Sequence, residues 1–205
     1  MIGYQVAQGT GHIYKDTRGR IAVNAYVDGT LTDASGSVTC TVTDESGTVI
    51  LNAVTATNDG TGVYYVDLGI SNTTDVNKLY AVWTGTWESI SQKLRTNHEI
   101  LGFPIFTEAQ ARSFDVSQLT ASDYSDADIL DERQKITDLL EQWTGVSWTP
   151  RYNRVKLQGE GDRIISPPSF HITKVISVTS LGESIATSNF EIDNNAGFIH
   201  RKDGF

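Results

Sequence analysis

The alternation of apolar and polar residues between Arg20 and Ile100 predicts a series of short β-strands. Apolar residues at every second position are typical of a strand with one buried face. Turn residues that tolerate positive φ separate the strands, among them Asp28-Gly29 and Asn58-Asp59-Gly60. About seven such strands are typical of an immunoglobulin-like sandwich. The apolar runs are Ile21, Val23 and Ala25; Val38, Cys40 and Val42; Val49 and Leu51; Val63 to Leu68; and Leu79 to Trp83.

The pattern becomes helical after Gly102-Phe103-Pro104. Thr107 and Gln110 form a capping box, which predicts a short helix that ends at about Phe114. Ser125 begins a second helix and Gly145 ends it, because glycine readily adopts the left-handed conformation at a helix C-terminus. Helical spacing places five apolar residues on one face of this second helix: Ile129, Ile136, Leu139, Leu140 and Trp143.

Strand-like runs return after Pro150 and predict a small antiparallel sheet. They are Val155 and Leu157; Ile164 and Ile165; Val175, Ile176 and Val178; Phe190 and Ile192; and Phe198 and Ile199. Glycine, proline and asparagine clusters punctuate them at 159–162, 166–168 and 194–197. The sequence therefore predicts a multidomain protein, with an all-β immunoglobulin-like sandwich at 1–103 and an α+β domain at 104–205.

The charge balance argues against tight binding to nucleic acid. The chain of 205 residues has a net charge of −9, with 6 basic and 10 acidic residues in 1–104 and 10 basic and 15 acidic residues in 105–205. Clustered lysine and arginine supply most non-specific affinity for phosphate, and neither half has an excess of them. Passage of DNA beside an acidic wall remains compatible with this composition.

Cysteine count and hydropathy narrow the class of protein further. Cys40 is the sole cysteine, which excludes an intrachain disulfide and a multi-cysteine metal site. The first residues lack the pattern of a signal peptide, and no apolar run approaches 18 residues. We therefore expect a soluble cytosolic product without membrane association.

Residues that could carry catalysis are sparse. The four histidines are scattered singly, and the glycine-rich stretches lack the lysine of a phosphate loop. The acidic run from Asp123 lacks the glycine and the final glutamate of a calcium loop. We therefore expect no enzyme activity, no cofactor and no metal. Trp83 or Trp87 is expected to pack in the core, with ligand stacking as the alternative.

The second half of the sequence resembles the head-tail connector (adaptor, or neck) proteins of tailed bacteriophages. The similarity covers about 105–205 and depends on the spacing of its motifs more than on single residues. The matching segments are 127–129, Ile136 to Gly145, Trp148-Thr149-Pro150-Arg151, Val155-Lys156-Leu157, Gly159-Glu160-Gly161, 164–168, Val175-Ile176-Ser177-Val178, Gly182, Phe190 and Gly197-Phe198-Ile199. The first hundred residues lie outside this resemblance and are similar to the immunoglobulin-like modules of phage structural proteins.

The resemblance implies a virion protein of the neck, assembled in the host cytoplasm. Such a protein forms a homo-oligomeric ring of about twelve subunits below the portal, continues the DNA channel with transient non-specific contact to packaged DNA, and seats the next neck or tail protein. Acidic residues of the second helix are candidates for the channel lining, or for a solvent-facing surface: Asp126, Asp128, Asp131, Glu132, Asp138 and Glu141. Trp148, Arg151 and Tyr152 are candidate subunit contacts.

The last residues of the sequence differ from the connector pattern. Connector proteins continue past the last strand pair into a tail that engages the portal, whereas this sequence ends at Phe205, so a neighbour would complete the sheet or its edge would stay open.

The alternative function is a phage tail or surface binding module. The sandwich would then recognise carbohydrate or a host protein through the loops Asn72 to Asn77 or Thr84 to Ser89.

Overall fold

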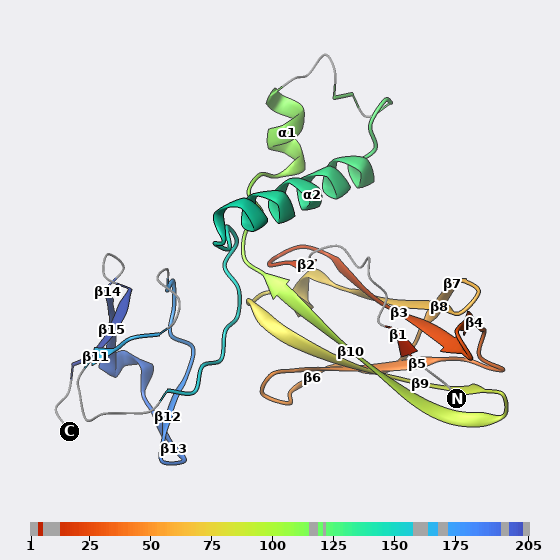
Figure 1. Ribbon diagram of the computed structural model, residues 1–205, viewed down its shortest axis with the longest axis horizontal. Helices are drawn as coiled ribbons and strands as arrows, with labels where there is room; N and C mark the ends of the chain where they lie inside the picture. The colour runs from red at the N-terminus through yellow and green to blue at the C-terminus, as the bar shows by residue number, and fades with distance from the viewer. Residues whose placement is uncertain are drawn as a thin grey trace. The chain divides into compact units, whose positions relative to one another are not determined.

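The computed structural model describes residues 4–5, 13–114, 119–120, 122–157, 164–167, 172–193 and 197–202. These residues form mostly β-sheet, with two α-helices and several separate sheets (Figure 1). The coarse prediction of a mainly β part followed by helices and small antiparallel sheets is confirmed. The chain divides into two compact units, Met1–Tyr152 and Asn153–Phe205. The predicted division into domains at 103–104 stays a prediction.

Two five-stranded sheets make up most of the first unit. One sheet has the order β1-β3-β8-β7 with β4 beside β3, and the other has the order β2-β10-β9-β5-β6. Neighbouring strands are antiparallel except β2, which runs parallel to β10. The strands are β1 (Tyr4–Gln5), β2 (Ile13–Tyr14), β3 (Gly19–Val27), β4 (Thr30–Leu31), β5 (Thr39–Asp44), β6 (Val49–Thr55), β7 (Thr57–Gly60), β8 (Val63–Leu68), β9 (Asn77–Trp87) and β10 (Ile90–Leu101), with a short 3-10 helix, η1 (Ile70–Asn72).

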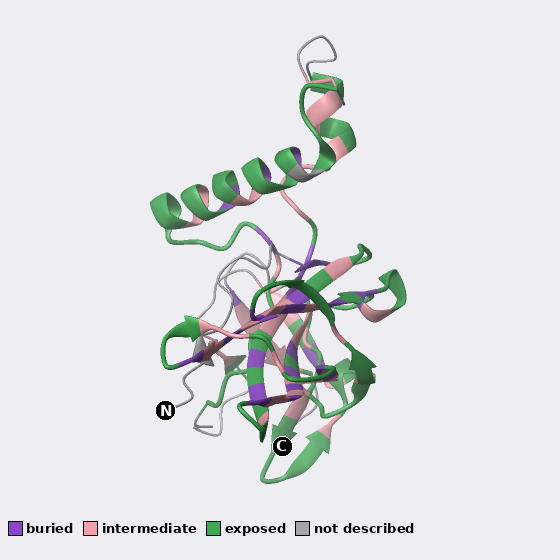
Figure 2. Ribbon diagram, turned by 90° about the vertical axis from the view of Figure 1, so that its right-hand side faces the viewer, coloured by how far each residue is buried: buried purple, intermediate pink, exposed green. Residues whose placement is uncertain are grey.

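The core lies between these two sheets, and strand alternation supplies it. Buried positions alternate with intermediate or exposed ones along β3, β8 and β9, as the period of two predicts. Figure 2 shows such alternation as purple bands between pink and green ones. Trp83 and Trp87 are 0% and 1% exposed, so both tryptophans pack in the core as expected. Cys40 is also fully buried, and burial raises the pKa of its thiol to about 12.

The turn predicted at Asn58-Asp59-Gly60 is wrong, because these residues lie in β7. The sequence pattern also does not identify the longest strand, β10. Two of its inward positions are polar, Thr96 and His98, and this breaks the apolar alternation. Inside the sandwich these side chains form a chain of hydrogen bonds. The Nε1–H of Trp83 donates to Oγ1 of Thr96 at 2.9 Å, and Oγ1 of Thr96 lies 2.8 Å from Nε2 of His98.

Two helices follow β10 within the first unit. Helix α1 (Glu108–Phe114) begins at the predicted capping box, in which the backbone N–H groups of Thr107 and Gln110 donate to each other's side chains at 2.8 and 3.2 Å. Helix α2 (Asp126–Thr144) begins after Ser125 and ends at Gly145, also as predicted. No helix among the described residues is long and apolar enough to cross a membrane.

The described residues of the second unit form two small antiparallel sheets. One has the order β11-β15-β14, and the other is the hairpin of β12 and β13. The predicted strand at Val155 and Leu157 is wrong, because this segment is irregular, and the strand expected from Val175 begins only at Val178. The turns predicted at 159–162, 168 and 194–196 lie outside the described residues. The elements are β11 (Ile164–Ile165), β12 (Val178–Ser180), β13 (Glu183–Ile185), η2 (Thr187–Asn189), β14 (Phe190–Asp193) and β15 (Phe198–Arg201).

Candidate assembly surface

Helix α2 carries most of the predicted site residues, and local sequence sets both of its ends. At the start, Oγ of Ser125 accepts from the N–H of Asp128 at 3.3 Å, while Oδ2 of Asp128 accepts from the N–H of Ser125 at 2.8 Å. This reciprocal pair satisfies two backbone donors of the first turn. At the end, Gly145 has φ +66° and its N–H donates to the carbonyl of Glu141 at 2.9 Å. The helix is thus fixed in length at 19 residues.

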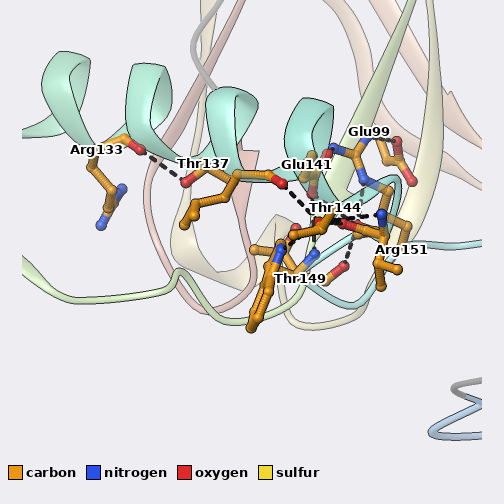
Figure 3. A network of polar contacts seen from close by, with 11 residues as sticks. Glu99, Arg133, Thr137, Glu141, Thr144, Thr149 and Arg151 are labelled. Carbon is orange, nitrogen blue, oxygen red and sulfur yellow. Dashed lines mark hydrogen bonds and ion pairs between the residues drawn. The ribbon is translucent and has the colours of Figure 1, made fainter.

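The packed face of α2 is more polar than the sequence predicts. Its buried positions are Ile129, Arg133 and Thr137, which recur every four residues. The guanidinium of Arg133 stacks over the Tyr14 ring at 4.5 Å and donates to the carbonyl of Phe106 at 3.2 Å. Thr137 is fully buried and donates to the carbonyl of Arg133 at 2.8 Å (Figure 3). A cation on an aromatic ring therefore joins α2 to β2 of the sandwich.

Four apolar residues on another side of α2 form an uncovered surface, here called the α2 stripe: Ile136, Leu139, Leu140 and Trp143. Three of them are 42%, 43% and 75% exposed, in the order Ile136, Leu139 and Trp143, while Leu140 is half-buried. The predicted apolar face therefore exists, but only Ile129 at its N-terminal end is buried. A contiguous exposed apolar surface of this kind is typical of protein–protein contact sites.

A polar network joins the end of α2 to the sandwich (Figure 3). Arg151 lies at its centre, with Nη2 2.6 Å from Oε2 of Glu141 on α2 and Nη1 3.5 Å from Oε2 of Glu99 on β10. Nε of Arg151 also donates to Oγ of Ser147 at 2.9 Å. Burial raises the pKa of Glu99, and the charge of Arg151 opposes this effect. The guanidinium of Arg151 thus bridges the carboxylates of Glu99 and Glu141, which are 42 residues apart in the sequence.

A backbone hydrogen bond also holds together the junction between the end of α2 and β10. The N–H of Gly102 donates to the carbonyl of Pro150 at 2.7 Å. A Cβ added at Gly102 would lie 2.6 Å from the Pro150 ring, which is too close for any side chain. The segments that enter and leave the helical pair are therefore held side by side, and α2 has a fixed attachment to β10.

The six predicted channel-lining carboxylates do not gather on one face. Asp126 is bound to Arg112 at 2.6 Å, and Asp128 belongs to the N-terminal cap. Asp131 and Glu132 both contact Nζ of Lys135, at 2.9 and 2.7 Å. Asp138 is exposed, whereas Glu141 turns toward Arg151. Asp131 and Asp138, seven residues apart, lie on one side of the helix, and both are exposed.

The three predicted subunit contacts have different surroundings. Trp148 is 54% exposed, and its Nε1–H donates to Oγ1 of Thr144 at 3.0 Å. Arg151 is engaged within the chain by Glu99 and Glu141, so its role here is to hold α2 in place. The backbone of Tyr152 bonds to Glu99 beside it. Of the three, Trp148 presents the largest uncovered apolar surface.

The sandwich loops proposed for ligand recognition are short and internally bonded. Thr73 in the first loop is fully buried, and its hydroxyl donates to the carbonyl of Thr17 at 2.6 Å. The segment Thr84 to Ser89 is the end of the β9–β10 hairpin, with a two-residue turn at Glu88 and Ser89 in which both φ angles are positive. These loops are therefore part of the structural frame of the sandwich.

One prominent residue of the second unit, Leu181, is not indicated by the sequence pattern. It lies at the turn of the β12–β13 hairpin, is fully exposed at 103%, and has φ +52°. The dipeptide Leu-Gly is not a typical hairpin turn, since asparagine or aspartate normally precedes the glycine. The signal in the sequence was Gly182 between two short runs of strand-forming residues.

No family model, no curated protein and no solved structure matches the chain.

Proposed function

We propose that this chain is a structural virion protein of tailed bacteriophages, a head-tail connector that forms a homo-oligomeric ring below the portal. The single observation that carries the proposal is the α2 stripe, a set of large apolar side chains that the first unit leaves uncovered on a firmly attached helix. The motif spacing of 105–205, which resembles connector proteins, supports the same conclusion. The chain would act in the virion neck, without enzyme activity or cofactor.

The distribution of large exposed apolar side chains in the first unit supports assembly through its helical part. Among the described residues, nine lie between 103 and 148, whereas five lie in the longer stretch from 13 to 102. The nine are Phe103, Phe114, Tyr124, Leu130, Ile136, Leu139, Trp143, Val146 and Trp148. Burial of such residues in subunit contacts is the usual source of association free energy.

Charge supports a role beside DNA rather than tight binding to it. Residues 1–152 contain 10 basic and 19 acidic residues, whereas 153–205 contain 6 of each, so the whole net charge of −9 lies in the first unit. Acidic walls repel phosphate, and packaged DNA can then slide without adhering. We propose that Asp131 and Asp138 face the channel of the ring.

For the sandwich we propose an immunoglobulin-like fold. Its sheet order β1-β3-β8-β7 corresponds to the A-B-E-D arrangement of that fold. The order β10-β9-β5-β6 corresponds to G-F-C with an additional C′ strand. Displayed around a ring, such a module would be available for contacts with the next neck or tail protein.

Electron microscopy and light scattering of the purified chain, alone and mixed with its portal protein, test the ring directly. We expect closed rings, or rings that form on the portal. Persistent monomers under both conditions contradict the proposal. Glycan-array binding by monomers would instead favour the alternative of a surface binding module.

Charge reversal tests the channel lining. Rings of the Asp131→Lys, Asp138→Lys double variant should retain duplex DNA in a gel-shift assay at low salt, with retention falling steeply as salt rises. Wild-type rings and rings of the matched Asp59→Lys, Asp75→Lys variant, which changes exposed sandwich residues, should not retain it. Equal retention by both variants would remove Asp131 and Asp138 from the lining.

A further inference from the structure

The tip of the β12–β13 hairpin presents a leucine under backbone strain. Ser180 pairs with Glu183, and both intervening residues have positive φ, +52° at Leu181 and +88° at Gly182. This is a type I′ turn, in which a leucine at the first position is sterically disfavoured. The β3–β4 hairpin has the same turn with the favoured pair Asp28-Gly29. Turn geometry alone therefore does not explain Leu181.

Full exposure makes the leucine costly in a second way. Leu181 is 103% exposed, more than any other large apolar residue among those described. Strained residues with unfavourable exposure persist where they serve a contact. The hairpin contains no lysine or arginine, and its sole charge is Glu183. This composition argues against an anionic membrane or nucleic acid as the partner.

The α2 stripe has the geometry that accepts a single apolar side chain. Ile136, Leu139, Leu140 and Trp143 stand at i, i+3, i+4 and i+7, the four positions that surround one inserted side chain in helix packing. Lys135, beside the stripe, is already paired with Asp131 and Glu132. A neutral apolar group can therefore bind there without leaving a charge unpaired.

We propose that Leu181 of one copy inserts into the α2 stripe of a second copy. This inference rests on the proposed ring and names its contact. A protruding residue and its receptor at different places on one chain produce a head-to-tail contact, which closes into a ring when the rotation between copies allows it. The partner is thus another copy of this chain.

The substitution Leu181→Asn separates the contact from the fold. Asparagine tolerates positive φ and forms the favoured Asn-Gly turn, so the hairpin is retained while the apolar side chain is removed. We expect self-association to weaken about 10- to 100-fold, the effect of losing one buried leucine. Leu181→Met should associate like the wild type. The control Ile90→Asn, at an exposed apolar residue of the sandwich, should leave association unchanged.

Cysteine trapping identifies the two surfaces. Equal amounts of Leu181→Cys and Leu139→Cys chains, mixed and oxidised, should give a disulfide-linked dimer. A mixture of Leu181→Cys with Ile90→Cys should not give one. Cys40 is fully buried and will not compete.

Four results would overturn the inference. Wild-type association by Leu181→Asn, or failure of the mixed cysteine variants to link, rejects this contact while leaving the ring intact. A Leu139→Cys, Leu181→Cys double variant that closes only an internal disulfide places the leucine on its own chain. Wild-type chains that remain monomeric both alone and with the portal reject the ring and this contact together.

Discussion

At the scale of single residues, three polar side chains that face into the sandwich keep one histidine, His98, neutral. Trp83 can only donate through its ring, so the hydroxyl proton of Thr96 is free to be donated to Nε2 of His98. This arrangement suits a neutral imidazole. Burial acts in the same direction and lowers the pKa of His98 from 6.5 to about 4.

We expect stability to fall as the pH drops from 6.5 toward 4. The unfolded chain binds a proton at His98 in this range and the folded chain does not, so the stabilising contribution is fully present above pH 6.5 and is lost below it. The loss between pH 7.5 and pH 5 should be about 2 kcal/mol. Urea unfolding at both pH values checks this. The difference should shrink in His98→Gln, and an equal fall in both proteins would contradict it.

Cys40 gives a second expectation at this scale. Burial raises the pKa of its thiol to about 12, which leaves almost no thiolate at pH 8. Labelling with Ellman's reagent should therefore be at least about 1,000-fold slower in the native protein than in urea. Rapid labelling of the native chain would show that the sandwich opens around β5.

At the scale of elements, α2 is defined by its ends more than by its faces. The capping box at Ser125 and the left-handed Gly145 are both local features, and each acts within one helical turn. The apolar residues between them do not decide which face packs, because Arg133 and Thr137 take the inward positions.

Substitution of Gly145 tests the C-terminal stop. No atom lies within 4 Å of a Cβ built on Gly145, so the cost of Gly145→Ala is conformational and should lower the free energy of unfolding by about 1 kcal/mol. Gly145→Asn should cost less, since asparagine tolerates this φ. Urea unfolding measures both variants. If both variants lowered the free energy of unfolding equally, packing and not the positive φ would explain why glycine occupies position 145.

At the scale of the whole first unit, Arg151 joins two elements that are remote in sequence. Its partners Glu99 and Glu141 are 26% and 19% exposed at the side chain, so loss of the guanidinium takes a positive charge away from two partly buried carboxylates. This makes the junction sensitive to one residue.

We expect Arg151→Ala to lower the free energy of unfolding by about 2 kcal/mol and to speed amide hydrogen exchange in α2. The matched variant Glu99→Gln should cost less than about 1 kcal/mol, because it keeps the bridge to Glu141 and removes a carboxylate that burial already disfavours. Unchanged exchange in α2 of Arg151→Ala would show that the Gly102–Pro150 contact holds the helix alone.

Local sequence by itself determined the strand alternation of β3, β5, β8 and β9, the hairpin turn at Asp28-Gly29 and the ends of both helices. Each depends on residues within a few positions of one another, where propensity and periodicity act directly. The same reasoning placed the acidic residues of the candidate lining on α2. It could not find β10, whose inward Thr96 and His98 are tolerated only because Trp83 completes their hydrogen bonds.

The tertiary structure alone decided which side of α2 is covered. The sequence pattern predicts an apolar face, yet Arg133 packs inward because the Tyr14 ring lies there to receive its charge. Likewise, Arg151 was a candidate subunit contact, but it pairs within its own chain with Glu141 and Glu99, which lie 10 and 52 residues earlier in the sequence. Contacts between distant residues select among faces that local patterns leave equivalent, and within the first unit they leave the α2 stripe uncovered.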